Sequence, residues 1–95
     1  MPMPNWAVRR GPPEYRSPPG TGEPDRTTPL HAGDFVRLAA MPGHRLVIVE
    51  VQQADRGIYR GEIVASAPTL ASRLQCGDKV EFRWRHVLEV TRVGR

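Results

Sequence analysis

The stretch R-L-V-I-V-E-V, residues 45–51, decides the fold. It is rich in β-branched side chains and nearly apolar throughout, which is typical of a central β-strand. Turn formers stand on both sides of it, M-P-G-H at residues 41–44 and Q-Q-A-D-R-G at residues 52–57. Gly57 can supply the positive φ of a hairpin turn. The stretch is therefore predicted to be a strand that is joined to its neighbours by tight turns.

Four further strands are predicted, one before this stretch and three after it. H-A-G-D-F-V-R-L-A, residues 31–39, alternates apolar and polar side chains after a Gly-Asp turn. I-Y-R-G-E-I-V-A, residues 58–65, reads as the return strand of a hairpin, and Gly61 inside it indicates a bulge or bend. The last two strands are predicted over residues 79–86 and 87–93, and no βαβ spacing appears.

A near-repeat supports a small barrel. G-D-F-V-R-L at residues 33–38 and G-D-K-V-E-F at residues 77–82 share a Gly-Asp entrance, where Asp can bond the following backbone amides and Val points inward. Residues 66–76 break the alternation and predict one short helical turn near 68–75. The predicted fold is mainly β: a small, mostly antiparallel SH3-like β-barrel of about five strands, or a strongly curved sheet, over residues 31–93, with this one helical turn.

The first thirty residues differ sharply in composition. Eight of the ten prolines lie there, and large apolar side chains are few. Such a segment buries too little apolar surface to offset its ordering entropy. We therefore expect a disordered or polyproline-like Pro/Arg-rich tail over residues 1–30 and a small β-barrel domain over residues 31–95. The expected core consists of Phe35 or Val36, Leu38, Leu46, Ile48, Val49, Val51, Ile63, Leu70, Leu74, Val80, Phe82, Val87 and Leu88.

The chain is mildly basic. Lys and Arg number 14 against 10 Asp and Glu, which gives a formal net charge of +4. This is short of the dense single-sign charge of a DNA-packaging protein. Lys79 is the one lysine, so arginine dominates. Arginine suits bidentate phosphate contacts and stacking, but a GC-rich bacterial genome that favours arginine codons would give the same bias.

The compartment follows from cysteine usage and hydropathy. A single cysteine, Cys76, excludes an internal disulfide and fits a reducing cytoplasm. No apolar run approaches the roughly 20 residues that span a bilayer, and the Pro-rich start does not resemble a signal peptide. We expect a cytoplasmic protein without membrane contact.

The sequence offers little for catalysis. The candidate metal ligands His31, His44, Cys76 and His86 lack the paired spacing of metal sites, so no metal or cofactor is expected. The serines have no nucleophile-elbow context, and the acidic residues stand in turns or alternate with apolar residues. In a domain this small we expect no small-molecule substrate and no enzymatic activity.

The best functional candidate is the basic-aromatic stretch G-D-K-V-E-F-R-W-R-H-V, residues 77–87. In an extended strand Phe82 and Trp84 share one face, and Arg83 and Arg85 share the other. This favours the core for the two aromatic rings over a base-stacking platform. A strand face of mixed charge can also be merely solvated. The candidate nucleic-acid-binding residues are Arg37, Arg60, Arg83 and Arg85, together with Arg9, Arg10 and Arg16 in the tail.

Four stretches also occur in a family order: G-D-F-V-R-L, R-L-V-I-V-E-V, G-I-Y-R-G-E-I-V-A-S-A-P and G-D-K-V-E-F-R-W-R-H-V. In this order, residues 33–90 resemble the uncharacterised family of small bacterial domains that includes YegJ. The chain departs from that pattern at Val47 or Ile48, where the family often has Trp, and at residues 65–67, where it has an Asn-containing turn. The resemblance implies a compact β-rich domain without an established activity.

Two function classes remain. The first is a non-enzymatic, small basic β-barrel module, a nucleic-acid-binding accessory protein of a bacterium or mobile element. The alternative is a protein–protein interaction module, such as an inhibitor, immunity or adaptor protein, that uses the sheet edge or the tail. The tail segments W-A-V-R-R (6–10) and E-Y-R-S-P-P (14–19) suit a docking arm that orders on binding, or a flexible leader without specific use.

Overall fold

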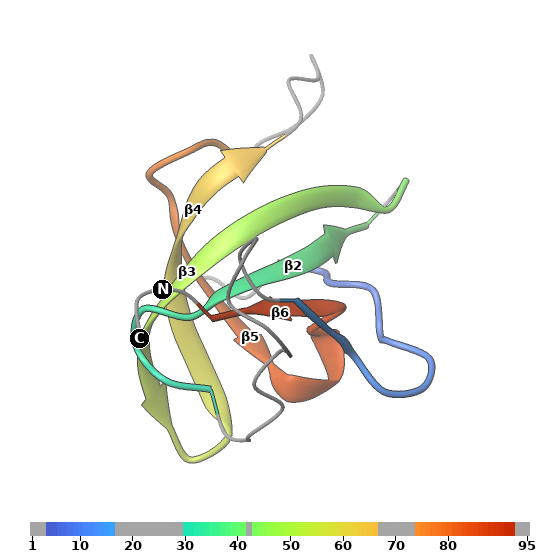
Figure 1. The fold of residues 1–95 in the computed structure, drawn as a ribbon. Helices are drawn as coiled ribbons and strands as arrows, with labels where there is room; N and C mark the ends of the chain where they lie inside the picture. Colours follow the sequence, from blue (N-terminus) through green and yellow to red (C-terminus); the bar gives the residue numbers. More distant parts are fainter. Residues whose placement is uncertain (1–3, 17–29, 42, 67–73, 93–95) are drawn as a thin grey trace.

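The computed structural model describes residues 4–16, 30–41, 43–66 and 74–92. This part of the chain is mainly β, with one 3₁₀ turn, η1, and a six-stranded mixed sheet in the order β1-β6-β2-β3-β4-β5 (Figure 1). The elements are β1 (Glu14–Arg16), β2 (Phe35–Ala40), β3 (Arg45–Asp55), β4 (Ile58–Ser66), β5 (Lys79–Arg83), η1 (Trp84–His86) and β6 (Glu89–Thr91). The strand order has two ends, β1 and β5, so the hydrogen-bonded sheet of the described residues is not closed.

The β3–β4 hairpin confirms the predicted turn. Asp55 pairs with Ile58, and the two residues between them, Arg56 and Gly57, both have positive φ, 50° and 84°. Two positive φ values are what a type I′ turn requires, and that turn matches the twist of the strands it joins. β2, β3, β4 and β5 thus form an antiparallel meander.

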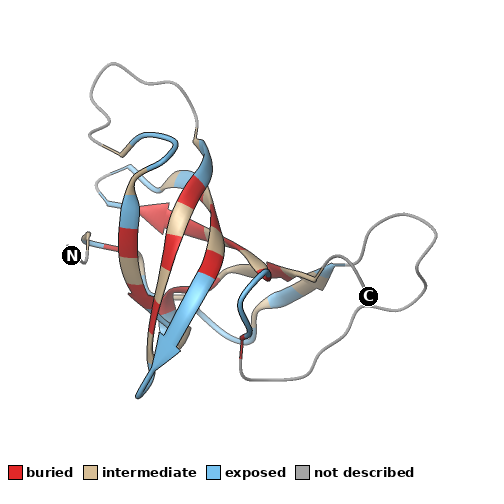
Figure 2. Ribbon diagram, turned by 90° about the vertical axis from the view of Figure 1, so that its left-hand side faces the viewer, coloured by how far each residue is buried: buried red, intermediate tan, exposed pale blue. Residues whose placement is uncertain are grey.

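The central strand β3 is buried on one face only. Val47, Val49 and Val51 point into the core, whereas Leu46 is 46% exposed and Ile48 is partly exposed. Figure 2 shows this alternation of buried and more exposed residues along the strands. The prediction that Leu46 and Ile48 belong to the core is therefore wrong, because no second layer covers that part of the outer face among the described residues.

The rest of the predicted core is largely right. The predicted members that are buried are Val36, Leu38, Val49, Val51, Ile63, Val80, Phe82 and Val87. Leu88 is only partly buried, and Leu74 is partly buried against the core. Leu70 and most of the helical turn predicted near 68–75 lie outside the described residues. The core also contains residues that the sequence analysis omits, namely Trp6, Leu30, Ala39, Ala40, Val47, Tyr59 and Val90.

Gly61 marks the close approach of β3 and β4, as its place inside a strand indicates. It is buried, and it pairs with Val51 next to a register shift that leaves Gln52 unpaired. A Cβ on this glycine would collide with the carbonyl oxygen of Glu50 and lie 2.6 Å from Val49 Cγ1. Only glycine fits here without a shift of the neighbouring backbone.

Both Gly-Asp entrances have the same local geometry, with a glycine φ of 94° in each. The aspartate, however, bonds a preceding amide rather than the following ones that the sequence suggests. Asp34 Oδ2 accepts a 2.8 Å bond from the His31 N–H, and Asp78 Oδ2 a 2.9 Å bond from the Gln75 N–H. Asp34 Oδ2 also accepts a 3.1 Å hydrogen bond from Arg92 Nε, and both side chains of this ion pair are buried. This pair joins the entrance of β2 to the end of β6.

The strand predicted through residue 86 ends earlier. β5 stops at Arg83, and Trp84–His86 form η1. The Arg83 N–H donates a 3.0 Å hydrogen bond to His86 Nδ1, and the Val87 N–H donates one of 3.0 Å to the Trp84 carbonyl. These bonds turn the chain so that β6 can pair with β2. The period-2 assignment of faces therefore does not apply beyond β5.

Residues 4–16, part of the tail that the sequence predicts to be disordered, lie along the sheet (Figure 1, blue). β1 pairs in parallel with β6, with Glu14 opposite Glu89 and Tyr15 opposite Val90. For residues 4–16 the prediction of disorder is wrong, because backbone pairing and one buried aromatic ring supply what the sparse apolar content does not. The remainder of the tail lies outside the described residues, except for Leu30, which is buried.

Trp6 bridges two strands that are not neighbours in the sheet. It forms an isolated antiparallel bridge with Ala40 at the end of β2, and the Ala7 N–H donates to the Ala39 carbonyl at 2.8 Å. Its indole N–H donates a 2.7 Å hydrogen bond to the Glu81 carbonyl on β5. The ring is 4% exposed. The N-terminal segment thus spans the distance between β2 and β5.

Two side chains cap the outer edge of β5. The Trp6 indole N–H donates a hydrogen bond to the Glu81 carbonyl, and His86 Nδ1 accepts one from the Arg83 N–H. Unpaired backbone groups at a sheet edge are a template for pairing with another chain. This end of the sheet is therefore partly protected from strand addition.

Candidate nucleic-acid interface

The N-terminal segment and η1 bring four of the seven candidate arginines to one place. Arg83 ends β5, and Arg85 lies in η1. The Arg9 N–H donates a 2.7 Å hydrogen bond to the Arg85 carbonyl. Arg9 and Arg10 therefore run beside the turn. These four residues, Arg9, Arg10, Arg83 and Arg85, are called the η1 arginine cluster below.

The guanidinium of Arg9 is held in a fixed position. Its Nη1 donates to the carbonyls of Trp84 at 2.8 Å and Val87 at 2.7 Å, and its Nε donates to the Gly11 carbonyl at 2.7 Å. Partial burial lowers the pKa of Arg9, and interaction with Tyr15 opposes that change. A guanidinium remains charged at neutral pH. Arg9 thus adds a positive charge that is matched by backbone carbonyls.

The other three cluster members face solvent. Arg10, Arg83 and Arg85 are exposed, and none forms an ion pair with a carboxylate of the described residues. Two of these charges act on His86: burial lowers the pKa of its imidazole, and the positive charges of Arg85 and Arg83 lower it further. The cluster therefore concentrates positive charge without an acidic partner in this part of the chain, and three of its guanidinium groups face solvent.

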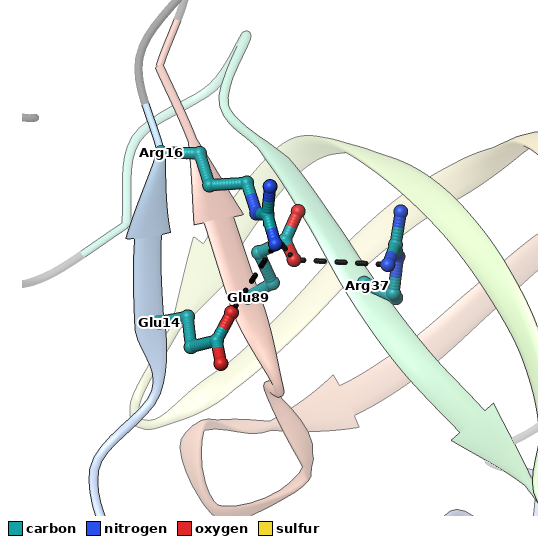
Figure 3. Close-up of polar contacts among 4 residues, drawn as sticks. All are labelled: Glu14, Arg16, Arg37 and Glu89. Carbon is teal, nitrogen blue, oxygen red and sulfur yellow. Dashed lines mark hydrogen bonds and ion pairs between the residues drawn. The ribbon is translucent and has the colours of Figure 1, made fainter.

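Arg16 and Arg37 lie elsewhere and are paired with carboxylates (Figure 3). Arg16 Nε lies 2.8 Å from Glu89 Oε2, and Arg37 Nη1 lies 3.7 Å from the same oxygen. Arg16 Nη2 also lies 3.4 Å from Glu14 Oε2. Two arginines thus share two glutamates across β1, β6 and β2. This surface carries little net charge.

Arg60 is paired as well. Its Nε lies 2.7 Å from Glu81 Oε2, and the hydrogen bond and charge of Glu81 raise the pKa of Arg60. On the same two strands, Lys79 Nζ lies 2.7 Å from Glu62 Oε1 and lowers the pKa of that carboxyl. The outer face of β4 and β5 is a set of ion pairs rather than a basic surface.

Trp84 lies between the core and the N-terminal segment. Its side chain is partly buried and packs against the hydrophobic core. The guanidinium carbon of Arg9 lies 5.1 Å from the centre of its ring, which is a cation–π contact. The ring is neither a full core residue nor a free platform. The guanidinium over this ring belongs to Arg9, which is 75 positions away in the chain.

The sequence pattern identifies the arginines as candidates, but it does not show which of them are paired with glutamates in the fold. Within W-A-V-R-R, the useful signal is Trp6, a large apolar side chain in an otherwise polar segment. Such a side chain anchors a segment when the fold offers it a site. That site consists of the end of β2 and the outer edge of β5, two places that only the tertiary structure brings together.

The remaining surface of the described residues carries open depressions. One of about 570 Å³ is lined by Pro12, Pro13, Glu14, Tyr15 and Arg16 at β1. Another of about 240 Å³ is lined by Arg37, Leu46, Ile48, Ala65 and Ser66 on the outer face. Within this part of the chain, no group of three or more His, Cys, Asp or Glu side chains could hold a metal ion. Nor does any helix there have the length and apolar character needed to cross a membrane.

Searches against protein-family models, curated proteins and solved structures gave no match to this chain.

Proposed function

We propose that this protein is a non-enzymatic binding module whose η1 arginine cluster contacts the phosphates of nucleic acid, as an accessory protein of a bacterium or mobile element. One observation carries the proposal. Among the described residues, the cluster gathers arginines without carboxylate partners, whereas Arg16, Arg37 and Arg60 are paired with glutamates. Unpaired guanidinium groups in water are the usual source of affinity for a phosphate backbone.

We further propose that the fold is of the SH3-like barrel type, with the N-terminal segment as an addition. Support comes from the antiparallel meander β2-β3-β4-β5, the 3₁₀ turn before the last strand, and the return of β6 to β2. The bulged pairing of β3 with β4 supports strong curvature. Small barrels of this kind bind their ligands at the surface.

The direct test measures affinity for a fluorescent 20-nucleotide strand and for a duplex of the same length at low salt, by anisotropy. The double variant Arg83→Gln/Arg85→Gln removes two exposed charges of the cluster. The matched control, Arg16→Gln/Arg37→Gln, removes the same number of charges from the paired surface. At 50 mM salt the loss of two phosphate contacts weakens binding by about 10- to 100-fold, and the control is expected to change it by less than threefold.

Either of two results would reject the proposal. The first is no detectable binding to any strand or duplex at low salt. The second is an equal loss of affinity in both double variants, because that would mean a diffuse attraction to the whole protein instead of a site at η1.

The alternative, a protein–protein interaction module, is favoured by the edge of β1. In a parallel ladder alternate residues bond to the neighbouring strand, and Glu14 N–H already bonds the Leu88 carbonyl. Tyr15 therefore directs its N–H and carbonyl away from β6, and no other described strand covers that edge. A peptide could add there as a further strand.

Amide hydrogen exchange distinguishes protein binding at the β1 edge from nucleic-acid binding at η1, once a binding partner has been isolated. A protein partner captured after nuclease treatment would slow exchange of the Tyr15 N–H if it adds to the β1 edge. Unchanged exchange at Tyr15 in that complex would reject this docking mode.

A further inference from the structure

The aromatic rings of this protein are all engaged. The chain has two Trp, two Tyr and two Phe, and all of them lie in the described residues. Trp6, Tyr59 and Phe82 are buried, and the last two stack at 5.6 Å between ring centres. Tyr15 is partly buried against the core, and Phe35 is partly buried on β2, away from η1. In η1 itself the rings are Trp84 and the imidazole of His86, and His86 is buried.

Trp84 is not free to stack on a base. Its side chain packs against the core, and the Arg9 guanidinium lies over its ring at 5.1 Å. Hydrogen bonds from Arg9 to three backbone carbonyls, those of Trp84, Val87 and Gly11, keep it there. A base that stacked on this ring would have to displace Arg9 and break those bonds. The contact therefore covers the ring with positive charge.

Charge remains available where stacking does not. Arg10, Arg83 and Arg85 are exposed; Arg10 follows Arg9 in the chain, and Arg83 and Arg85 flank Trp84. Proteins that bind single strands through bases pair a basic groove with open aromatic faces, each worth several-fold in affinity. Here the basic groups are present and the open aromatic face is absent. Such a surface can contact phosphates and has no open aromatic face on which a base could stack.

We propose that the η1 arginine cluster recognises the phosphodiester backbone alone, with no base stacked on Trp84, so that binding does not depend on base identity or even on the presence of bases. This inference rests on the proposed function and specifies what its site reads. The ligand is a phosphodiester chain of any sequence, contacted through exposed guanidinium groups. Arg9 acts as the cover of the ring and as a fixed positive charge behind them.

The test compares a mixed-sequence 20-nucleotide strand with a fully abasic strand of the same length and charge, using the full chain and fluorescence anisotropy at one salt concentration. We expect the two dissociation constants to agree within threefold. One stacked base is worth about 1–3 kcal/mol, so a stacking site would weaken abasic binding by about 5- to 150-fold. A loss of fivefold or more with the abasic strand overturns the inference while leaving the proposed function intact.

Failure of the proposed function gives a different result. If neither strand binds better to the native protein than to Arg83→Gln/Arg85→Gln, the site itself is rejected, and the inference with it. A second readout follows Trp84 fluorescence in a Trp6→Phe variant that has been shown to be folded. We expect its emission to change by less than one tenth on saturation with the base-containing strand, whereas quenching by half or more would overturn the inference.

Discussion

Replacement of Trp6 is the sharpest test of the role of the N-terminal segment. Its ring is 4% exposed, and its indole N–H donates a 2.7 Å hydrogen bond to the Glu81 carbonyl. Truncation of a buried large aromatic side chain typically costs about 3–5 kcal/mol. A domain of this size has a total stability of roughly 5–14 kcal/mol. Trp6→Ala is therefore expected to remove a large fraction of the stability of the whole domain.

Trp6→Phe separates the hydrogen bond from the apolar contact. Phenylalanine keeps most of the buried ring but leaves the Glu81 carbonyl without its donor. An unmatched buried acceptor costs about 1–3 kcal/mol. We expect the free energy of unfolding of Trp6→Phe to lie between those of the native protein and Trp6→Ala. Its loss of stability relative to the native protein should reflect the missing hydrogen bond to β5.

Urea unfolding followed by circular dichroism measures both effects. The matched control is Val8→Ala on the same segment, because Val8 is 61% exposed and its truncation should change the free energy of unfolding by less than about 0.5 kcal/mol. If Trp6→Ala also changes the free energy by less than about 0.5 kcal/mol, the segment does not pack on the sheet. The prediction of a disordered tail would then hold for residues 4–16.

Three further predictions concern the sheet and η1. Gly61→Ala should destabilise the fold strongly, because its Cβ would collide with the Glu50 carbonyl, and a melting temperature within 2 °C of the native value would contradict this. Asp34→Asn should cost about 1.5–3 kcal/mol in urea unfolding, since it weakens a charged bond to the buried Arg92, and an unchanged midpoint would contradict it. The folded-state pKa of His86 lies below its usual value of 6.5, so the unfolded chain takes up the proton first and stability falls as pH drops below about 6.5. His86→Gln should flatten the curve of unfolding free energy between pH 7.5 and 5.5, and an identical curve in both proteins would contradict this.

Much of the sheet is predictable because its signals are local. The turn at Arg56 and Gly57 and the extended conformation of the apolar run at residues 45–51 depend on neighbours in the chain. The glycine inside β4 indicates the close backbone approach for the same reason. These features need no knowledge of where distant residues lie.

The errors arise where distant segments meet. Leu46 is as apolar as its neighbours, but its exposure depends on whether another layer covers β3. Trp84 leaves the strand pattern because the chain must turn so that β6 can pair with β2. Trp6 is buried because β2 and β5 together leave room for it. None of these partners can be read from local spacing.

The candidate site shows the same division. Composition alone identifies arginine as the abundant cation, and alternation identifies which arginines are on the outside of strands. Whether an arginine is paired depends on tertiary contacts, as between Arg37 and Glu89, which are 52 positions apart in the numbering. We therefore propose the phosphate contacts for the η1 arginine cluster, because Arg16, Arg37 and Arg60 are paired with glutamates.

The slope of log affinity against log salt concentration tests the central claim most directly. Each phosphate contact contributes about −0.9 to the slope on duplex DNA, so contacts from the three exposed members of the cluster predict about −2.7. Arg83→Gln/Arg85→Gln should reduce the slope to about −0.9, and Arg16→Gln/Arg37→Gln should leave it at the native value. An unchanged slope in the η1 variant, or an equal reduction in both, would contradict a nucleic-acid site at η1.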